Sequence, residues 1–175
     1  MKLASVLTPL SEENLALAAQ TGVESITIRY QGPILEDWKP AVDLIRSYGM
    51  EIAAVEDAIA MENIIRGSEG RDDEIDGIIS LLHIMKELAI PVLCYNFMAG
   101  TDWVRTKTDV LDRAGAKVTQ FNLSEIDLAV SLDDASKQLE HEELEAAALW
   151  ENLEFFLRRV LPVAEELEID LAMHP

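Results

Sequence analysis

The sequence predicts an α/β fold with parallel strands, on three observations. Segments of strand-like composition alternate with segments of helical periodicity, in the order β-α four times and then a fifth strand. Residues 91–94, PVLC, form an apolar run without alternation, which is typical of a strand buried on both faces. No linker or shift in composition divides the chain. We therefore expect a single α/β domain over residues 1–175, with right-handed crossovers between its strands.

Each element has a local signal. Short runs rich in β-branched and apolar residues predict strands at residues 2–7, 25–30, 51–57, from 91 onward, and 169–173. Helices are expected from Ser11, a good N-cap, to about residue 20, and over residues 36–48, 72–89 and 142–167. The loop at 58–70 has room for one helical turn. Residues 107–123 are the irregular part, and within them the weak alternation at 116–123 predicts an extra hairpin arm or a lid. Residues 124–139 predict a short, loosely fixed helix.

Composition limits the classes of function. The chain has 175 residues, 49% hydrophobic, and no apolar run near the ~20 residues of a membrane span. Its formal net charge of −19 repels nucleic acid and anionic membranes, so we expect neither as a partner. The semi-apolar start is too short for a signal peptide, and Cys94 is the only cysteine. These features predict a cytoplasmic location.

Polar residues follow the predicted strands. They are Arg29 and Tyr30, then Glu56, then Tyr95 and Asn96, and finally His174. In a parallel barrel the carboxyl ends of the strands share one face, where such enzymes place their sites. The alternative is that strand ends are solvated in any fold.

The loop after the fourth strand carries Trp103 and Arg105. The pair suits a polyhydroxy acid, with the ring against its carbon-bound hydrogens and the guanidinium against its carboxylate. Loop packing explains the two residues equally well. Cys94 lies mid-strand and is expected to be a small core residue. His83 and His141 are expected on helix surfaces.

Several longer motifs resemble the mannonate dehydratase family. They are CYNFM at 94–98 with DWVRT at 102–106, Arg71-Asp72 at a helix start, and WENLEFFLRRVLPVAEELEIDLAMHP at 150–175. The resemblance runs in order over nearly the whole chain and covers the amino-terminal half of the family's length. It implies a TIM-barrel type (β/α)8 fold, of which this chain carries about the first four β-α units plus strand five.

The resemblance also implies a function and a site. Family members are hydro-lyases that dehydrate D-mannonate to 2-keto-3-deoxy-D-gluconate in hexuronate catabolism, with Mn²⁺ or Fe²⁺. His174 matches a divalent-metal ligand of the family, whose other ligands come from later strands. Binding of the sugar acid is expected at Arg29, Glu56, Asn96, Trp103 and Arg105. No residue is assigned as the catalytic base.

Departures from the family's usual motifs leave the identity of the sugar acid undetermined. Residues 60–63 read AMEN where the family commonly reads VHED, and residues 96–99 read NFMA in place of NFMP. Two alternatives also stand: a metal-dependent sugar isomerase or epimerase on the same barrel, and a non-catalytic fragment. With half a barrel, the outer strands keep open edges, so we expect a homo-oligomer that is inactive as the isolated chain.

Overall fold

The computed structural model describes residues 2–57, 59–98, 104–132 and 144–174. These residues group into two compact units, Met1–Phe97 with Ala146–Pro175, and Met98–Glu145. Each unit is described by itself below. The expected single domain over residues 1–175 stays a prediction.

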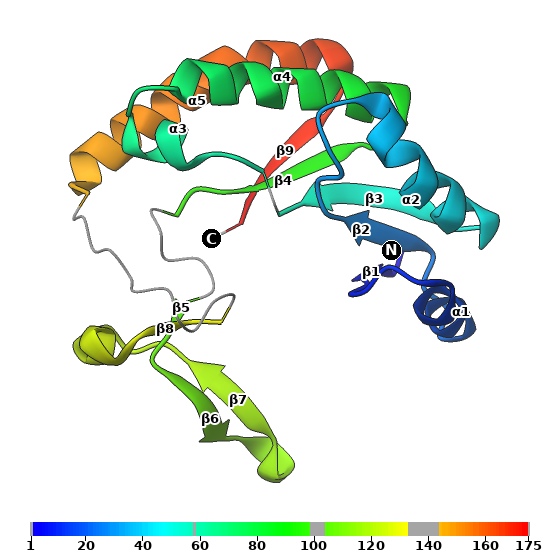
Figure 1. Cartoon of the computed structure of the whole chain (residues 1–175), viewed down its shortest axis with the longest axis horizontal. Helices are drawn as coiled ribbons and strands as arrows, with labels where there is room; N and C mark the ends of the chain where they lie inside the picture. Colours follow the sequence, from blue (N-terminus) through cyan, green and yellow to red (C-terminus); the bar gives the residue numbers. More distant parts are fainter. Residues whose placement is uncertain (1, 58, 99–103, 133–143, 175) are drawn as a thin grey trace. The chain divides into compact units, whose positions relative to one another are not determined.

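A five-stranded parallel sheet organises the first unit (Figure 1). Its order is β1-β2-β3-β4-β9, and every neighbouring pair is parallel. The strands are β1 (Ala4–Val6), β2 (Ser25–Ile28), β3 (Glu51–Glu56), β4 (Val92–Asn96) and β9 (Asp170–His174). Strands consecutive in this unit are therefore neighbours in the sheet, as the alternating β-α pattern predicts.

Helices connect the strands and cover the sheet. They are α1 (Glu12–Gln20), α2 (Leu35–Ser47), α3 (Glu62–Arg66), α4 (Arg71–Glu87) and α5 (Ala146–Leu167). The hydroxyl of Ser11 accepts from the backbone N–H of Asn14 at 3.2 Å, which confirms the expected N-cap of α1. Helices α3, α4 and α5 lie together on one side of the sheet (Figure 1). No helix in the described ranges is both long and apolar enough to cross a membrane.

The core of the first unit lies between the sheet and these helices. Val55 and Leu93 project from neighbouring strands and are fully buried, as are Trp38 of α2 and Phe156 of α5. The indole N–H of Trp38 donates to the carbonyl of Gly32 at 2.9 Å, so this buried polar group is satisfied. The face of the sheet that carries Val55 and Leu93 is therefore the core face.

The second unit is built from short antiparallel pairs. β5 (Val104–Arg105) pairs with β8 (Val130–Ser131), and β6 (Lys107–Leu111) pairs with β7 (Lys117–Gln120). The β6–β7 pair, closed by the 3₁₀ turn η1 (Arg113–Gly115), confirms the expected hairpin arm. A role as a lid stays a prediction.

The helix expected at residues 124–139 is wrong over its described part. The structure has a short 3₁₀ segment, η2 (Leu123–Leu128), followed by β8. The Asn122 side chain accepts from both the backbone N–H and the hydroxyl of Ser124, which favours a tight turn over an α-helix. Residues 133–139 lie outside the described ranges.

Candidate functional site at the carboxyl ends of the strands

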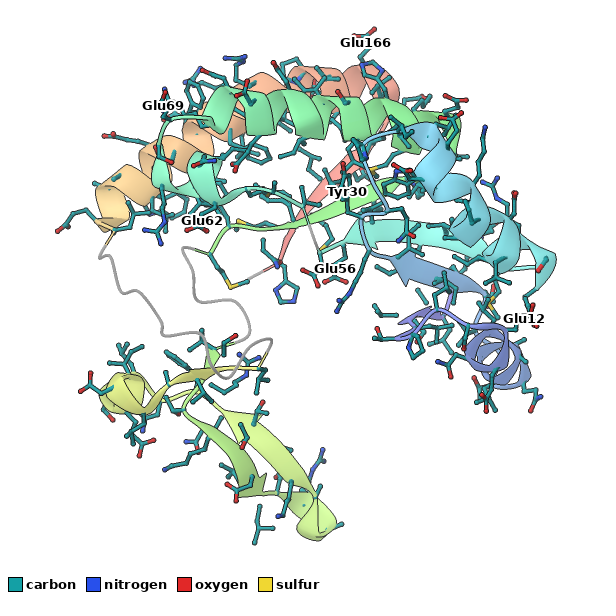
Figure 2. The ribbon with its side chains drawn as sticks, viewed as in Figure 1. Glu12, Tyr30, Glu56, Glu62, Glu69 and Glu166 are labelled. Carbon is teal, nitrogen blue, oxygen red and sulfur yellow. The ribbon has the colours of Figure 1, made fainter. Side chains whose placement is uncertain are left out.

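Strand register brings three of the polar strand-end side chains, together with Cys94, to one face of the sheet. Glu56 of β3 is the register partner of Cys94 of β4, and Asn96 is the partner of His174 of β9. Register partners on parallel strands share a face, and so do residues two apart along one strand. Glu56, Cys94, Asn96 and His174 therefore face away from the core, and Figure 2 shows Glu56 on the side of the sheet opposite α4 and α5.

Cys94 is not the small core residue that the sequence predicts. It is half-buried, and its Sγ lies 3.8 Å from Oε1 of Glu56. Burial, and then the charge of the Glu56 carboxylate, raises the pKa of the Cys94 thiol. The apolar run at 91–94 hid this orientation, because it lacks the alternation that would reveal two different faces.

Tyr95 is a correction to the expected set of strand-end groups. Its side chain points to the core face, where its ring meets that of Phe156 edge-on at a centroid distance of 5.2 Å. Burial raises the pKa of its hydroxyl. Because neighbouring residues of a strand face opposite ways, Tyr95 cannot share the face of Asn96.

Arg29 and Tyr30 follow the end of β2. The Nη2 atom of Arg29 lies 3.4 Å from Oδ2 of Asp57, the residue after β3, and the backbone N–H of Tyr30 donates to the Asp57 carbonyl at 3.3 Å. The Tyr30 ring packs edge-on against Trp38 (Figure 2 labels Tyr30). Burial, and then the charge of Asp37, raises the pKa of the Tyr30 hydroxyl. The Arg29–Asp57 pair was missed by sequence reasoning, which gave Asp57 no partner.

The remaining expected residues fall elsewhere. Arg105 lies in β5 of the second unit, where Nη1 donates to the Val104 carbonyl at 2.7 Å and Nε to the Thr119 hydroxyl at 3.3 Å. Trp103 and His141 lie outside the described residues. His83 is exposed on α4, as expected. The structure thus brings Glu56, Asn96 and His174 to one face and leaves the roles of Trp103 and Arg105 as predictions.

Comparison with known protein families identifies the family of this chain. A family model described as D-mannonate dehydratase (UxuA) matches residues 13–175. The chain belongs to this family. The mannonate dehydratase of Streptococcus pneumoniae (strain 70585) is 27% identical over 186 residues, which cover 94% of this chain and 50% of that protein. The chain therefore spans about half the length of the curated relatives it matches.

Solved structures agree on the fold. The crystal structure of mannonate dehydratase from Streptococcus suis serotype 2 superposes with a TM-score of 0.79 and 25% identity, over 100% of this chain and 53% of that one. A xylose isomerase-like TIM barrel protein from Mycobacterium smegmatis, solved with magnesium, matches with a TM-score of 0.52 and 10% identity, over 98% and 54% of the chains. The fold expectation, about half of a TIM barrel, is confirmed.

The described residues do not complete a metal site. No group of three or more histidine, cysteine, aspartate or glutamate residues that could hold a metal ion occurs in the described ranges. A divalent transition metal needs several such ligands, and His174 is the one ligand that the sequence predicts.

Proposed function

We propose that this chain forms part of a hydro-lyase that dehydrates D-mannonate to 2-keto-3-deoxy-D-gluconate, a step of hexuronate catabolism in the cytoplasm. The family match over residues 13–175 carries the proposal. It favours a dehydratase over the sugar isomerase or epimerase that the strand ends alone would also suit. We also propose that the protein is a homo-oligomer that binds a small sugar acid and has no nucleic acid or membrane partner.

The reaction is a β-elimination, and the sheet face offers groups that suit its substrate. A proton leaves the carbon beside the carboxylate, a hydroxyl leaves the next carbon, and the enol rearranges to the keto acid. The guanidinium of Arg29 binds the substrate carboxylate, since a charged fork of donors matches a carboxylate. Glu56 and Asn96 hydrogen-bond substrate hydroxyls. The base remains unassigned.

The Arg29–Asp57 pair supports the placement of the carboxylate. A chain with a net charge of −19 repels an anion at long range, so an anionic substrate needs a local cation. Arg29 is half exposed, and Asp57 holds its guanidinium at 3.4 Å without burying it. The side chain can thus be positioned by one carboxylate and still receive another.

A divalent cation, Mn²⁺ or Fe²⁺, belongs to the same proposal. His174 supplies one ligand from the carboxyl end of β9, and the described residues contain no group of three or more histidine, cysteine, aspartate or glutamate residues that could complete the site. When bound, such an ion stabilises the negative charge that develops on the carboxylate side of the substrate. Trp103 and Arg105 are also proposed to contact the substrate.

The test is a dehydratase assay on two proteins. One is the 175-residue chain, and the other is the product of the whole open reading frame that contains it. Each is given D-mannonate with Mn²⁺, and the keto acid is measured by NMR. We expect no product from the chain alone and 2-keto-3-deoxy-D-gluconate from the whole product. A folded, metal-loaded whole product that leaves D-mannonate unchanged but converts a ketose would replace this proposal with the isomerase or epimerase.

A further inference from the structure

Cys94 and Glu56 form a contact that the proposed reaction does not use. They are register partners on adjacent parallel strands, so the sheet itself fixes their separation. The Cys94 Sγ lies 3.8 Å from Oε1 of Glu56, and both side chains are half-buried on the face that carries Asn96 and His174. Sulfur is a weak donor, and at this distance the thiol suits a hydrogen bond to a carboxylate.

The protonation state of the thiol permits this bond. A thiol donates only while it carries its proton, and burial followed by the Glu56 charge raises the pKa of Cys94. No other charged group is in register with it, since its partner on β9 is Ala172. Farther along the same face lies His174, and Arg29 at the end of β2 is paired with Asp57. Cys94 therefore keeps its proton at neutral pH.

We propose that Cys94 is a positioning residue: its S–H donates to Oε1 of Glu56, fixes the rotamer of that carboxylate, and leaves Oε2 to accept from a substrate hydroxyl. The role of Oε2 rests on the proposed dehydratase function, whereas the thiol–carboxylate contact does not. The Glu56 side chain is half-buried and has several rotatable bonds. Without a fixed hydrogen-bond donor, its carboxylate would sample several rotamers.

The first test measures the rotamer of Glu56 by NMR side-chain couplings in the 175-residue chain. The Glu56 signals are identified by their loss in Glu56→Gln. We expect one rotamer in the parent chain, averaged rotamers in Cys94→Ala, and one rotamer again in Cys94→Ser, because serine restores a donor. Melting temperatures of the variants show that the fold is retained. Equal couplings in the parent, Cys94→Ala and Cys94→Ser chains would overturn the proposal.

The second test uses the only cysteine of the chain as its own probe. The rate of reaction with a chromogenic disulfide is measured against pH. We expect Glu56→Gln to lower the thiol pKa, because it removes a nearby negative charge and keeps the size of the side chain. Glu51→Gln, at the other end of β3, is the matched control and should leave the thiol unchanged. A thiol pKa that is equal in Glu56→Gln and Glu51→Gln would overturn the contact.

Neither measurement depends on turnover. If both succeed and D-mannonate is not a substrate of the whole product, the proposed function fails and the thiol–carboxylate contact stands. If both fail while D-mannonate is dehydrated, the proposed function stands and Cys94 is not a positioning residue.

Discussion

Asp57 shows how a single residue shapes the candidate site. Its backbone is left-handed, with φ 68°, directly after β3. Aspartate tolerates this conformation better than most residues because its short side chain can hydrogen-bond locally. The turn places its carboxylate near Arg29 and its carbonyl against the N–H of Tyr30. The ends of β2 and β3 are thereby tied together where the substrate carboxylate is proposed to bind.

At the same scale, His174 leads to a prediction about metal binding. It is the proposed metal ligand, and no group of three or more histidine, cysteine, aspartate or glutamate residues that could hold a metal occurs within the described residues. We expect the 175-residue chain to bind Mn²⁺ weakly, and His174→Ala to change that binding little, because a single imidazole holds such an ion poorly. Calorimetry gives the affinity, and His83→Ala, which removes an exposed histidine of α4, is the matched control. Tight stoichiometric binding that only His174→Ala removes would contradict the prediction.

Substitution of Arg105 distinguishes a role in turnover from a role in packing. Its two described hydrogen bonds, to the Val104 carbonyl and the Thr119 hydroxyl, stay within the second unit. In an active whole product we expect Arg105→Ala to lower turnover of the sugar acid roughly 10- to 100-fold, because a charged hydrogen bond is lost. The melting temperature should fall little. Thr119→Val removes only the local acceptor and should leave turnover near the parent value. Unchanged kinetics with a clearly lower melting temperature would make Arg105 a structural residue.

At the scale of elements, α5 presents two adjacent phenylalanines to different surroundings. Phe156 is fully buried, with ring centroids 5.2 Å from Tyr95 and 6.1 Å from Phe97. Phe155 is half-buried beneath the guanidinium of Arg71, whose Cζ lies 4.0 Å from the ring centroid. The first residue joins α5 to β4, and the second joins it to the start of α4.

This contrast predicts unequal costs of truncation. Phe156→Ala should lower the free energy of unfolding by about 3–5 kcal/mol, because it opens a cavity between helix and sheet. Phe155→Ala should cost about 1–2 kcal/mol, the scale of a partly exposed cation–π contact. Urea denaturation followed by circular dichroism compares the two. Equal costs would mean that the α4 contact stabilises this unit as strongly as the core does.

The regular elements of the first unit could be predicted from the sequence, and the irregular ones could not. The helix expected at 72–89 is α4 at Arg71–Glu87, and the strand at 51–57 is β3 at Glu51–Glu56, because apolar periodicity and strand composition are local signals. The β5–β8 pair joins only two residues of each strand across an intervening hairpin, and so short a pairing has no periodicity to detect.

The placement of the candidate site residues was predictable to the same degree. Strand ends identified Glu56, Asn96 and His174, and the register confirms that they share a face. The contact of Tyr95 with Phe156, by contrast, joins residues that are 61 positions apart in the chain and meet only in the fold. The Cys94–Glu56 contact likewise depends on register between strands, and a register has no signature within either strand alone.

At the scale of the whole molecule, the net charge and the open edges of the sheet have opposite effects on association between copies of the chain. β1 and β9 are the edge strands of the described sheet. Large apolar side chains are exposed along both, with exposed fractions of 53% for Leu3, 51% for Val6 and 50% for Met173. Edge strands with unpaired backbone groups and apolar neighbours favour association. The net charge of −19 repels a second copy.

These opposing effects predict that association between copies of the chain depends on salt concentration. We expect the 175-residue chain to form a dimer or larger species, and added salt to favour that species, because screening weakens the repulsion and leaves apolar burial intact. Light scattering at low and moderate salt measures the mass. Val6→Lys and Met173→Lys place charges on the two edge strands and should return the chain toward a monomer. Trp150→Lys changes an exposed apolar residue that belongs to α5 and to neither edge strand, so it should not. A stable monomer at both salt concentrations, with cooperative melting, would show that the first unit needs no partner at β1 or β9.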